Sequence, residues 1–581
     1  MNGGWYFHNA VVAIDTDCAL PNKAESSAQT QFATTTFYRL INPVSGWRAF
    51  NPNDNQRLAE AASTGAKGSV PVGFMQMLYH VKDLKVLEPI YWSRVVHPAH
   101  VHYGRWVFAS TQTPVAPDWD TEICALYDKL KPWTSEYLET VESARLTPEI
   151  LNIIAVRVTF LQGSQPLDVT ILFEPGSDGV AHLFSTNRFN VCKRLANDLI
   201  LHKAPKDVCQ TLVPFDWIQY QKLHGMTEQP FQLIGYKPPE VTSLILVFHG
   251  IGQKLSEKIE SVNFTYAIES LRVLIHSQLQ KKPVSEHVSP STHLLVLPVN
   301  WRAALSFQDD KDSFPLEDIS PPTIPLIRRA ITDIFMDLPY YMSHHRSSIL
   351  EAASAEANRL YDLVCQYNPS FSEKGKVNLI GHSLGSLIVA DLLSEQPNDW
   401  RSEGGRLRFN TKCFFTTGSP LALFLHFQHA NIIPRSLATT TEPTLGCFAA
   451  ESFYNLINHS DVFAFLLSPT VKGNPVKRPR VLNYAAAKDE KRTFSIFNRA
   501  RATNKTVEST PELKMLNDYG QLDWILPVGP RTFENQYFKI FTAHFDYWSN
   551  VEFATFVAIE CGRKEGAENA VEEYKVQASQ L

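Results

Sequence analysis

The second half of the chain alternates short apolar runs with longer amphipathic segments. Five apolar runs predict buried strands: Thr242–Phe248, Thr292–Val299, Val377–Ile380, Lys412–Thr417 and Ser452–Ile457. Apolar residues recur at helical spacing over about 256–281, after Ser386 and over 551–561. Because buried strands that alternate with helices are typical of parallel sheets, this half is predicted to be an α/β domain. We expect a mainly parallel sheet with helices on both faces.

The first half of the chain has a different pattern, with short apolar stretches separated by turns. Five stretches predict strands, the last two with exposed tryptophans: Trp5–His8, Thr36–Ile41, Gly46–Phe50, Pro89–Trp92 and Gly104–Phe108. Further on, one helix with Pro132 as a candidate break and two strands are predicted, at 121–145, Ile153–Leu161 and Val169–Phe173. Residues 1–150 are therefore expected to form a β-rich accessory region, and residues 151–240 a connecting segment.

Two insertions interrupt the alternating pattern of the second half. Residues 303–345 contain an acidic loop and then an apolar helix predicted from Ile324 to Met342, which would act either as a lid or as core cover. Residues 470–515 are polar and basic and are predicted to be a surface loop, either solvated or docked on anionic lipid. The main domain is expected to span 241–565, followed by a polar tail at 566–581.

Composition limits the classes of function. The net charge of the 581 residues is −5, so no basic field points to nucleic acid. The eight cysteines form no C-x-x-C pair and no cluster with zinc spacing, which favours buried free thiols in a reducing compartment. Neither a secretory signal nor a run of 18 apolar residues occurs. We expect a cytoplasmic protein that reaches any lipid by peripheral association with a membrane.

The most informative motif is Gly381-His-Ser-Leu-Gly385, which has the form G-x-S-x-G. A predicted strand precedes it and a predicted helix follows it, and this is the context of a nucleophile elbow. The glycines are expected because side chains would collide across so sharp a turn. Ser383 would then project above the strand end, with the backbone N–H of Leu384 available to a developing oxyanion.

A serine hydroxyl needs a base and a group that orients the base. In a hydrolase built around this elbow, the acid follows the serine along the chain and the histidine comes last. Asp461, just after the strand Ser452–Ile457, is the preferred acid, and Asp523 is its rival. Asp391 follows the serine too closely and falls on the helix behind it. His544 is the preferred base, with three rivals: His426, His429 and His459.

A second glycine-rich turn, His249-Gly-Ile-Gly252, follows the strand Thr242–Phe248. Backbone N–H groups near Gly250 and Ile251 are predicted to complete the oxyanion site with that of Leu384. An ordinary strand-to-helix turn is the alternative interpretation of the same residues.

Several separated motifs resemble the DDHD-domain family of intracellular phospholipases A1. They are His249–Gly252, Gly381–Ser386, Gly418–Pro420, Tyr454–Ala464 with Pro469, Leu522–Trp524 and His544–Trp548. Upstream, Val70–Val72, Pro89–Trp92 and Gly104–Trp106 resemble the family's N-terminal region, which includes a WWE-like module. The resemblance covers most of the chain, and it would place the DDHD domain at about 407–565.

The resemblance implies an α/β-hydrolase-like fold and a serine phospholipase A1 that needs no cofactor. It would cleave the sn-1 acyl ester of a glycerophospholipid, with phosphatidic acid preferred. The four residues that name the family would fall on Asp461, Asp523, His544 and Glu552, the last a departure from aspartate. The family resemblance also suggests an alternative in which Asp461, Asp523 and His544 hold a metal ion, but the serine elbow favours the triad.

Other functions remain open from the sequence. One is a different substrate, lysophospholipid or neutral glyceride, and another is a membrane-trafficking scaffold with a weakly active hydrolase domain. Arg328, Arg329 or the segment Lys477–Arg480 could bind an anionic head group, although nothing in the sequence places them near Ser383. The sequence predicts neither the oligomeric state nor which intracellular membrane, mitochondrial or secretory, the protein would visit.

Overall fold

The computed structural model describes most of the chain. The described residues are 4–8, 47–65, 68–73, 77–92, 99–112, 114–144, 150, 153–162, 165–176, 179–185, 210–216, 218–219, 222, 239–250, 264–305, 321, 323, 337–397, 405–437, 444–473, 479–482, 510–527 and 543–564. The chain divides into two compact units, Met1–Lys237 and Pro238–Leu581. Each unit is described by itself.

The first unit contains two antiparallel sheets. The larger has the strand order β2-β1-β6-β5-β4-β3. Its strands are β1 (Gly4–His8), β2 (Trp47–Ala49), β3 (Ser69–Val72), β4 (Tyr79–Lys82), β5 (Val86–Pro89) and β6 (Ala99–Gly104). The second sheet has the order β7-β11-β10-β9-β8. Its strands are β7 (Trp106–Phe108), β8 (Ala155–Gln162), β9 (Gln165–Phe173), β10 (Ala181–Ser185) and β11 (Gln210–Pro214). The β-rich character predicted for this region is confirmed.

Among the residues of this unit that the structure describes, three helices accompany the sheets: α2 (Pro52–Thr64), α3 (Pro117–Leu130) and α4 (Ser135–Ala144). The single helix predicted over 121–145 is thus two helices, and Lys131, in the left-handed conformation with a φ of 49°, ends the first of them just before Pro132. The second sheet takes strands from both sides of residue 150, since β7 pairs with β11.

The prediction of exposed tryptophans was wrong. Trp92 and Trp106 are fully buried, and Trp106 packs against Tyr127 and Phe173 with ring centroids 5.4 and 5.8 Å apart. These indoles contribute large apolar areas to a unit whose strands are short, which is why they lie inside.

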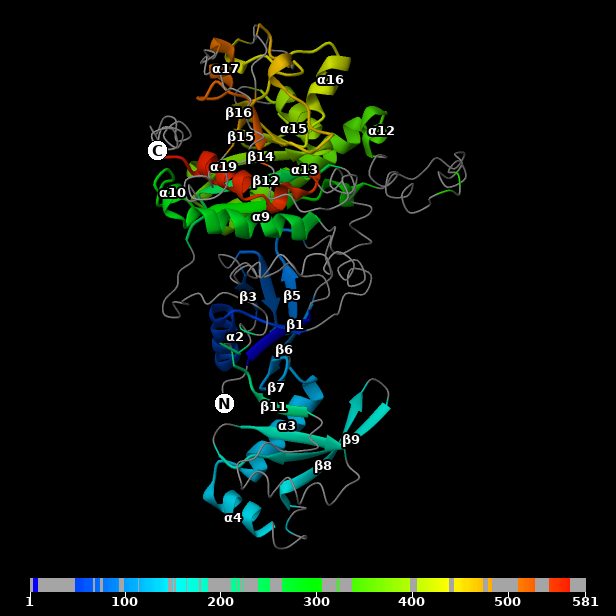
Figure 1. Cartoon of the computed structure of the whole chain (residues 1–581), viewed down its shortest axis with the longest axis vertical. Helices are drawn as coiled ribbons and strands as arrows, with labels where there is room; N and C mark the ends of the chain where they lie inside the picture. Colours follow the sequence, from blue (N-terminus) through cyan, green and yellow to red (C-terminus); the bar gives the residue numbers. More distant parts are fainter. Residues whose placement is uncertain are drawn as a thin grey trace, which may run out of the picture. The chain divides into compact units, whose positions relative to one another are not determined.

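The second unit is built on a seven-stranded parallel sheet with the order β13-β12-β14-β15-β16-β18-β17 (Figure 1). Its strands are β12 (Ser243–Phe248), β13 (Leu294–Val299), β14 (Lys376–His382), β15 (Thr411–Thr417), β16 (Ala450–Asn458), β17 (Arg480–Val481) and β18 (Asp523–Leu526). The five predicted strands are present, and β17 and β18 extend the sheet at one edge. Every residue of β12 and β13 is buried, as expected for strands covered on both faces.

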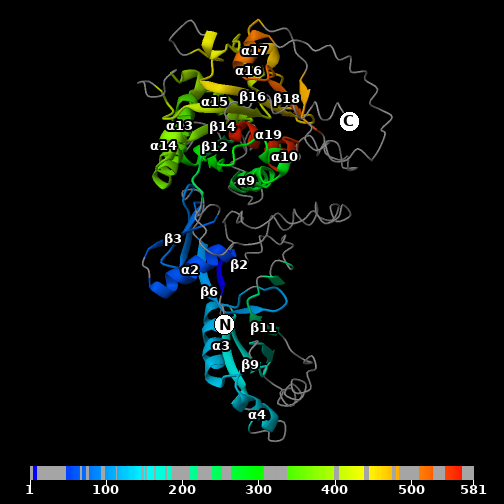
Figure 2. The same ribbon diagram turned by 90° about the vertical axis from the view of Figure 1, so that its left-hand side faces the viewer.

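Helices cover both faces of this sheet, so the predicted fold class is confirmed. Helices α9 and α19 lie on the opposite side of β12 and β14 from α13 and α15 (Figure 2). The helices in the described part of this unit are α9 (Phe264–Leu279), α10 (Lys282–Ser285), α12 (Asp337–Met342), α13 (Arg346–Tyr367), α14 (Phe371–Lys374), α15 (Leu384–Glu395), α16 (Leu421–Phe427), α17 (Pro511–Leu516) and α19 (Val551–Gly562). Short 3-10 turns occur at η3 (Trp301–Ala304), η4 (Arg435–Leu437), η5 (Ser468–Thr470) and η7 (Asp546–Ser549).

The two insertions are only partly described. Of the helix predicted from Ile324 to Met342, the structure describes α12 at its end, and the acidic loop lies outside the described residues. The same holds for Arg328, Arg329 and Lys477. Arg480, the last residue of the candidate segment, is described as the half-buried first residue of β17, and its head-group role stays a prediction. No helix among the described residues is long and apolar enough to cross a bilayer.

Candidate active site

Ser383 lies in a strained turn between β14 and α15. Its φ of 54° and ψ of −125° put a non-glycine residue in a region that costs about 1–3 kcal/mol and is typical of functional sites. The turn is also crowded, because a Cβ atom at Gly385 would lie 2.2 Å from the carbonyl oxygen of Phe248. The backbone N–H of Ser383 donates to the carbonyl of Thr417, at a distance of 3.0 Å. This geometry matches a nucleophile elbow.

Asp461 follows the carboxyl end of β16 and is held by three donors. Its Oδ1 accepts the backbone N–H of Phe463 at 2.9 Å, and its Oδ2 accepts the hydroxyl of Tyr547 at 2.8 Å. The third donor is His544, whose Nδ1 lies 3.0 and 3.1 Å from the two carboxylate oxygens. The structure therefore brings the preferred acid and the preferred base into direct contact, although 83 residues separate them along the chain.

The electrostatics of this pair favour an ionised acid. Both side chains are buried, and burial alone would raise the pKa of the Asp461 carboxyl. The hydrogen bond and charge of His544, with smaller contributions from Phe463 and Tyr547, outweigh burial and hold that pKa below its usual value. A carboxylate that stays ionised can fix the tautomer and orientation of an imidazole, which is the role of the third member of a serine triad.

Gly418, directly after β15, lies against the pair. A Cβ atom there would come within 2.7 Å of Asp461 Oδ2 and 3.0 Å of the His544 ring, and the φ of 55° also favours glycine. The preceding residue, Thr417, accepts the backbone hydrogen bond from Ser383. Ser383 and Asp461 thus follow the carboxyl ends of β14 and β16, which flank β15 in the sheet, and His544 contacts Asp461. Ligands bind at this edge of such sheets.

The predicted oxyanion site is partly described. A Cβ atom at Gly250 would lie 2.5 Å from Ser383 Cβ and 2.7 Å from the backbone nitrogen of Leu384, so the glycine-rich turn lies directly against the elbow. His249 Nδ1 donates to the carbonyl of Gly250 at 2.8 Å, and its ring stacks on Trp301. Ile251 lies outside the described residues, and its role stays a prediction.

Asp523, the rival acid and the third member of the alternative metal site, points elsewhere. It is fully buried, and its oxygens accept from Asn455 Nδ2 at 2.8 Å and from the backbone N–H groups of Leu467 and Ser468, each at 2.9 Å. Donors that occupy the carboxylate in this way compete with a metal ion. No group of three or more His, Cys, Asp or Glu suited to a metal occurs in the described part of the chain. The arrangement does not fit the metal alternative.

The remaining candidates lie away from the pair. His426, His429 and His459 are exposed. Asp391 lies two turns along α15, where it accepts from Tyr341 and, at 2.6 Å, from Arg346 Nη2. Glu552 is buried in the first turn of α19. Two residues beside the pair carried no prediction: Tyr547, which bonds Asp461, and His382.

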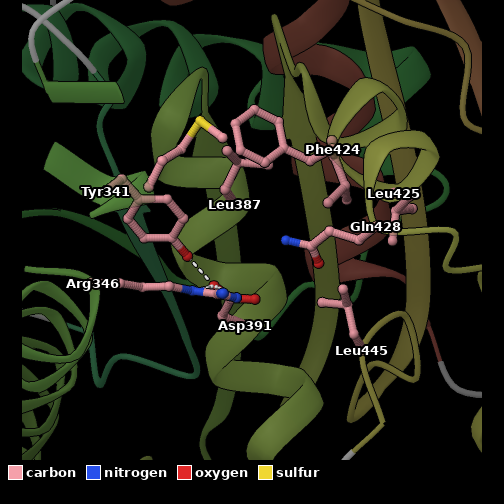
Figure 3. A pocket seen from close by; sticks show the side chains of 10 residues that line it. Tyr341, Arg346, Leu387, Asp391, Phe424, Leu425, Gln428 and Leu445 are labelled. Atoms are coloured by element: carbon pink, nitrogen blue, oxygen red, sulfur yellow. Dashed lines mark hydrogen bonds and ion pairs between the residues drawn. The ribbon is translucent and has the colours of Figure 1, made fainter. Parts of the chain in front are cut away.

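A cavity of about 100 Å³ lies beside α15, between α12, α13 and α16 (Figure 3). Its wall is apolar where Leu387 and Phe424 face each other, and it turns polar at the cluster of Tyr341, Arg346 and Asp391. Burial raises the pKa of the Asp391 carboxyl despite the guanidinium beside it. None of the candidate catalytic side chains lines this cavity, so it is a neighbour of the site rather than the place of reaction.

Comparison with known proteins agrees with this architecture. The model of the DDHD domain matches residues 407–485 and 477–561. The matched ranges contain Asp461 and His544, and the serine elbow precedes them. A probable mitochondrial phospholipase of Schizosaccharomyces pombe is 27% identical over 410 residues, which cover 55% of this chain and 54% of that protein.

Two further relatives give the same picture. A probable mitochondrial phospholipase of Saccharomyces cerevisiae is 26% identical over 382 residues, covering 58% of this chain and 51% of that protein. The human phospholipase DDHD1 is 26% identical over 296 residues, covering 40% of this chain and 30% of that protein. The chain thus spans about half the length of the two yeast proteins and less of the human one. The chain therefore contains a match to the DDHD domain within residues 407–561 and is similar to proteins named as phospholipases.

Proposed function

We propose that the chain is a serine phospholipase that hydrolyses an acyl ester of a glycerophospholipid. The observation that carries the proposal is the buried Asp461–His544 pair, bonded at 3.0 Å beside a strained serine elbow. The relatives named as phospholipases supply the class of substrate. Within that class we propose the sn-1 ester as the bond cleaved, with phosphatidic acid as the preferred lipid.

The reaction would run in two acyl-transfer steps. Ser383 Oγ attacks the ester carbonyl while His544 Nε2 takes the hydroxyl proton, and Asp461 stabilises the imidazolium that forms. The backbone N–H of Leu384 and the turn at Gly250 and Ile251 would hold the oxyanion. The C–O bond to glycerol then breaks, and His544 returns the proton to the leaving lysophospholipid. Water, activated by the same imidazole, releases the fatty acid from Ser383.

Two observations bear on the choice of substrate. The mouse protein named triacylglycerol hydrolase DDHD2 is 32% identical over 192 residues, so a neutral glyceride is a second candidate substrate. A lysophospholipid would use the same groups. The cavity beside α15 begins one helical turn from Ser383, at Leu387, and offers apolar surface near the elbow.

A scaffold in membrane trafficking is the alternative from another class. The mouse protein named SEC23-interacting protein is 34% identical over 230 residues, which cover 36% of this chain and 22% of that protein. The intact arrangement of Ser383, Asp461 and His544 supports the enzyme, since a scaffold has no need of a strained serine beside an acid–histidine pair. We further propose peripheral binding on the cytoplasmic side of an intracellular membrane, mitochondrial or secretory.

Product analysis of purified protein tests the proposal. Vesicles of phosphatidic acid, phosphatidylcholine and triacylglycerol-containing emulsions would be incubated with the wild type and with Ser383→Ala, and the products identified by mass spectrometry. We expect lysophosphatidic acid and fatty acid from the wild type, and a rate at least about 1,000-fold lower for the variant. Full activity of Ser383→Ala would reject the mechanism. A wild type without turnover, and without labelling of Ser383 by a fluorophosphonate, would favour the scaffold.

A further inference from the structure

The loop that follows Asp461 is apolar and yet lies on the surface. Residues 462–466 read Val-Phe-Ala-Phe-Leu, and none of the five is buried. The side chains of Val462, Phe465 and Leu466 are 57%, 38% and 38% exposed. Five consecutive apolar residues without a charge, facing water, are unusual for a soluble surface and mark a binding site.

Phe545 adds a second exposed apolar side chain next to the acid–histidine pair. It follows His544 directly, and its side chain is 37% exposed. Phe463 joins the two parts, because its ring lies 4.7 Å from the ring of His544. We call residues 462–466 together with Phe545 the apolar rim. Residues 462–466 directly follow Asp461, and Phe545 directly follows His544.

The backbone beneath the apolar rim is fixed. Phe465 N–H donates to the carbonyl of Ser419 at 3.1 Å, and the Phe465 carbonyl accepts from Asn455 Nδ2 at 2.9 Å. Asp461 and Asp523 bind the loop at its two ends through backbone N–H groups. These hydrogen bonds hold the backbone in the conformation that leaves the side chains of Val462, Phe465 and Leu466 on the surface.

We propose that the apolar rim inserts into the interfacial layer of a phospholipid bilayer and delivers lipid to Ser383. The choice of a bilayer rests on the proposed function. Ser383, Asp461 and His544 are at most 6% exposed, so an acyl ester must leave its membrane and pass the rim to reach them. A protein partner or a second copy seated on the same rim would cover that path.

The proposal also predicts the kind of attraction. The rim carries no charge and the chain has a net charge of −5, so binding comes from buried apolar area rather than from attraction to anionic lipid. Binding should therefore occur on phosphatidylcholine alone and change little with salt concentration.

Vesicle sedimentation with the full chain carrying Ser383→Ala tests the rim without any turnover. Phosphatidylcholine vesicles, with and without phosphatidic acid, would be mixed with this parent and with the same chain carrying Val462→Ser and Phe465→Ser. We expect the rim variant to bind at least about tenfold more weakly to both kinds of vesicle. The matched control replaces two apolar side chains of similar exposure elsewhere, Leu437→Ser and Met515→Ser, at 45% and 46%. This control should bind like the parent.

Thermal unfolding of each variant shows whether the fold is kept, and fluorophosphonate labelling of the wild-type serine reports the catalytic proposal separately. Vesicle binding by the rim variant equal to that of the parent overturns the proposal, as does a parent that binds no vesicle. A change from dimer to monomer in the rim variant, with vesicle binding intact, would instead assign the rim to a protein interface. Weaker vesicle binding by the rim variant, together with a wild type that is not labelled at Ser383, would keep the rim and reject the enzyme.

Discussion

His382 Nε2 lies 2.7 Å from the carbonyl oxygen of His544, and the two rings are 4.7 Å apart. The residue directly before the candidate nucleophile is thus bonded to the backbone of the candidate base. Because the carbonyl can only accept, His382 must carry its proton on Nε2. Burial, with a smaller contribution from the charge of His544, lowers the pKa of His382 to about 3, so it stays neutral at physiological pH. This bond joins two segments 162 residues apart.

His382→Leu is expected to lower kcat by about tenfold or more, because the imidazole of His544 loses a backbone anchor and misplacement at a reacting centre is costly. His382→Gln places an amide donor at a similar reach and should restore most of the rate. Steady-state kinetics on a soluble ester, with kcat and KM determined separately, measures this difference.

The interpretation requires the loss to fall on kcat and to be rescued by the amide. Equal losses in His382→Leu and His382→Gln, or a loss confined to KM, would show that the ring acts by packing against Trp548 and Tyr547 and not by its hydrogen bond.

Asp461→Asn and Asp523→Asn separate the two family aspartates by function. Asp461→Asn should reduce kcat by roughly 10³- to 10⁴-fold, because the amide no longer fixes the imidazole tautomer. Asp523→Asn should chiefly lower the free energy of unfolding. The new amide NH2 replaces one accepting oxygen and would point at an N–H donor of Asn455, Leu467 or Ser468, so a buried hydrogen bond is lost. Activity and denaturant unfolding, measured on both variants, check this contrast.

The metal alternative makes the opposite prediction for the same pair. If Asp461, Asp523 and His544 held an ion, both variants would lose activity together and a chelator would inhibit the wild type. We expect dialysis against a chelator to leave the rate of ester hydrolysis unchanged.

Part of this site follows from the sequence for a clear physical reason. A serine elbow demands a base and an acid, and parallel strands deliver their carboxyl ends to one edge, so chain order and strand ends were enough to pair Asp461 with His544. The contact between these two side chains is present in the structure. Their catalytic roles stay a prediction.

Other features depend on tertiary packing and could not be derived in this way. Asp523 occurs in a strand-like run as an acid would, and only the position of the loop after Asp461 shows that its oxygens are occupied. His382 gave no signal, since the x of G-x-S-x-G is unconstrained by the elbow itself. Trp92 and Trp106 were expected outside because short strands with turns resemble an exposed surface, whereas the aromatic packing partners come from distant segments.

Two buried histidines should make the stability of the protein depend on pH. Burial lowers the pKa of His249 to about 4 and that of His382 to about 3, below the ordinary value of 6.5. Below about pH 6.5 these histidines are protonated in the unfolded chain but stay neutral in the folded chain. The free energy of unfolding therefore falls as the pH drops below about 6.5. Each histidine contributes up to about 1.4 kcal/mol per pH unit in this window.

Asp461 acts in the same sense but at lower pH. Because its folded pKa is lowered, its contribution to stability is present above the unfolded pKa of an aspartate and is lost only as the pH falls through the folded value. Denaturant unfolding between about pH 7 and about pH 4 should thus report the histidines. His382→Gln should flatten the curve, and an unchanged slope in that variant would contradict its neutral, buried state.

Gly418→Ala should damage catalysis far more than stability. The new Cβ would lie 2.7 Å from Asp461 Oδ2 and 3.0 Å from the His544 ring, so the pair must move, and a shift of this size is expected to lower kcat by about 100-fold. Gly473→Ala is the matched control in the same unit, because Gly473 has a φ of 77° and the nearest atom to its added Cβ is Glu512 Oε1 at 3.9 Å. Both variants bear the left-handed backbone strain of about 1–2 kcal/mol, but only Gly418→Ala disturbs the pair. Comparable losses of kcat in the two alanine variants would mean that backbone strain, and not the displaced pair, explains the effect.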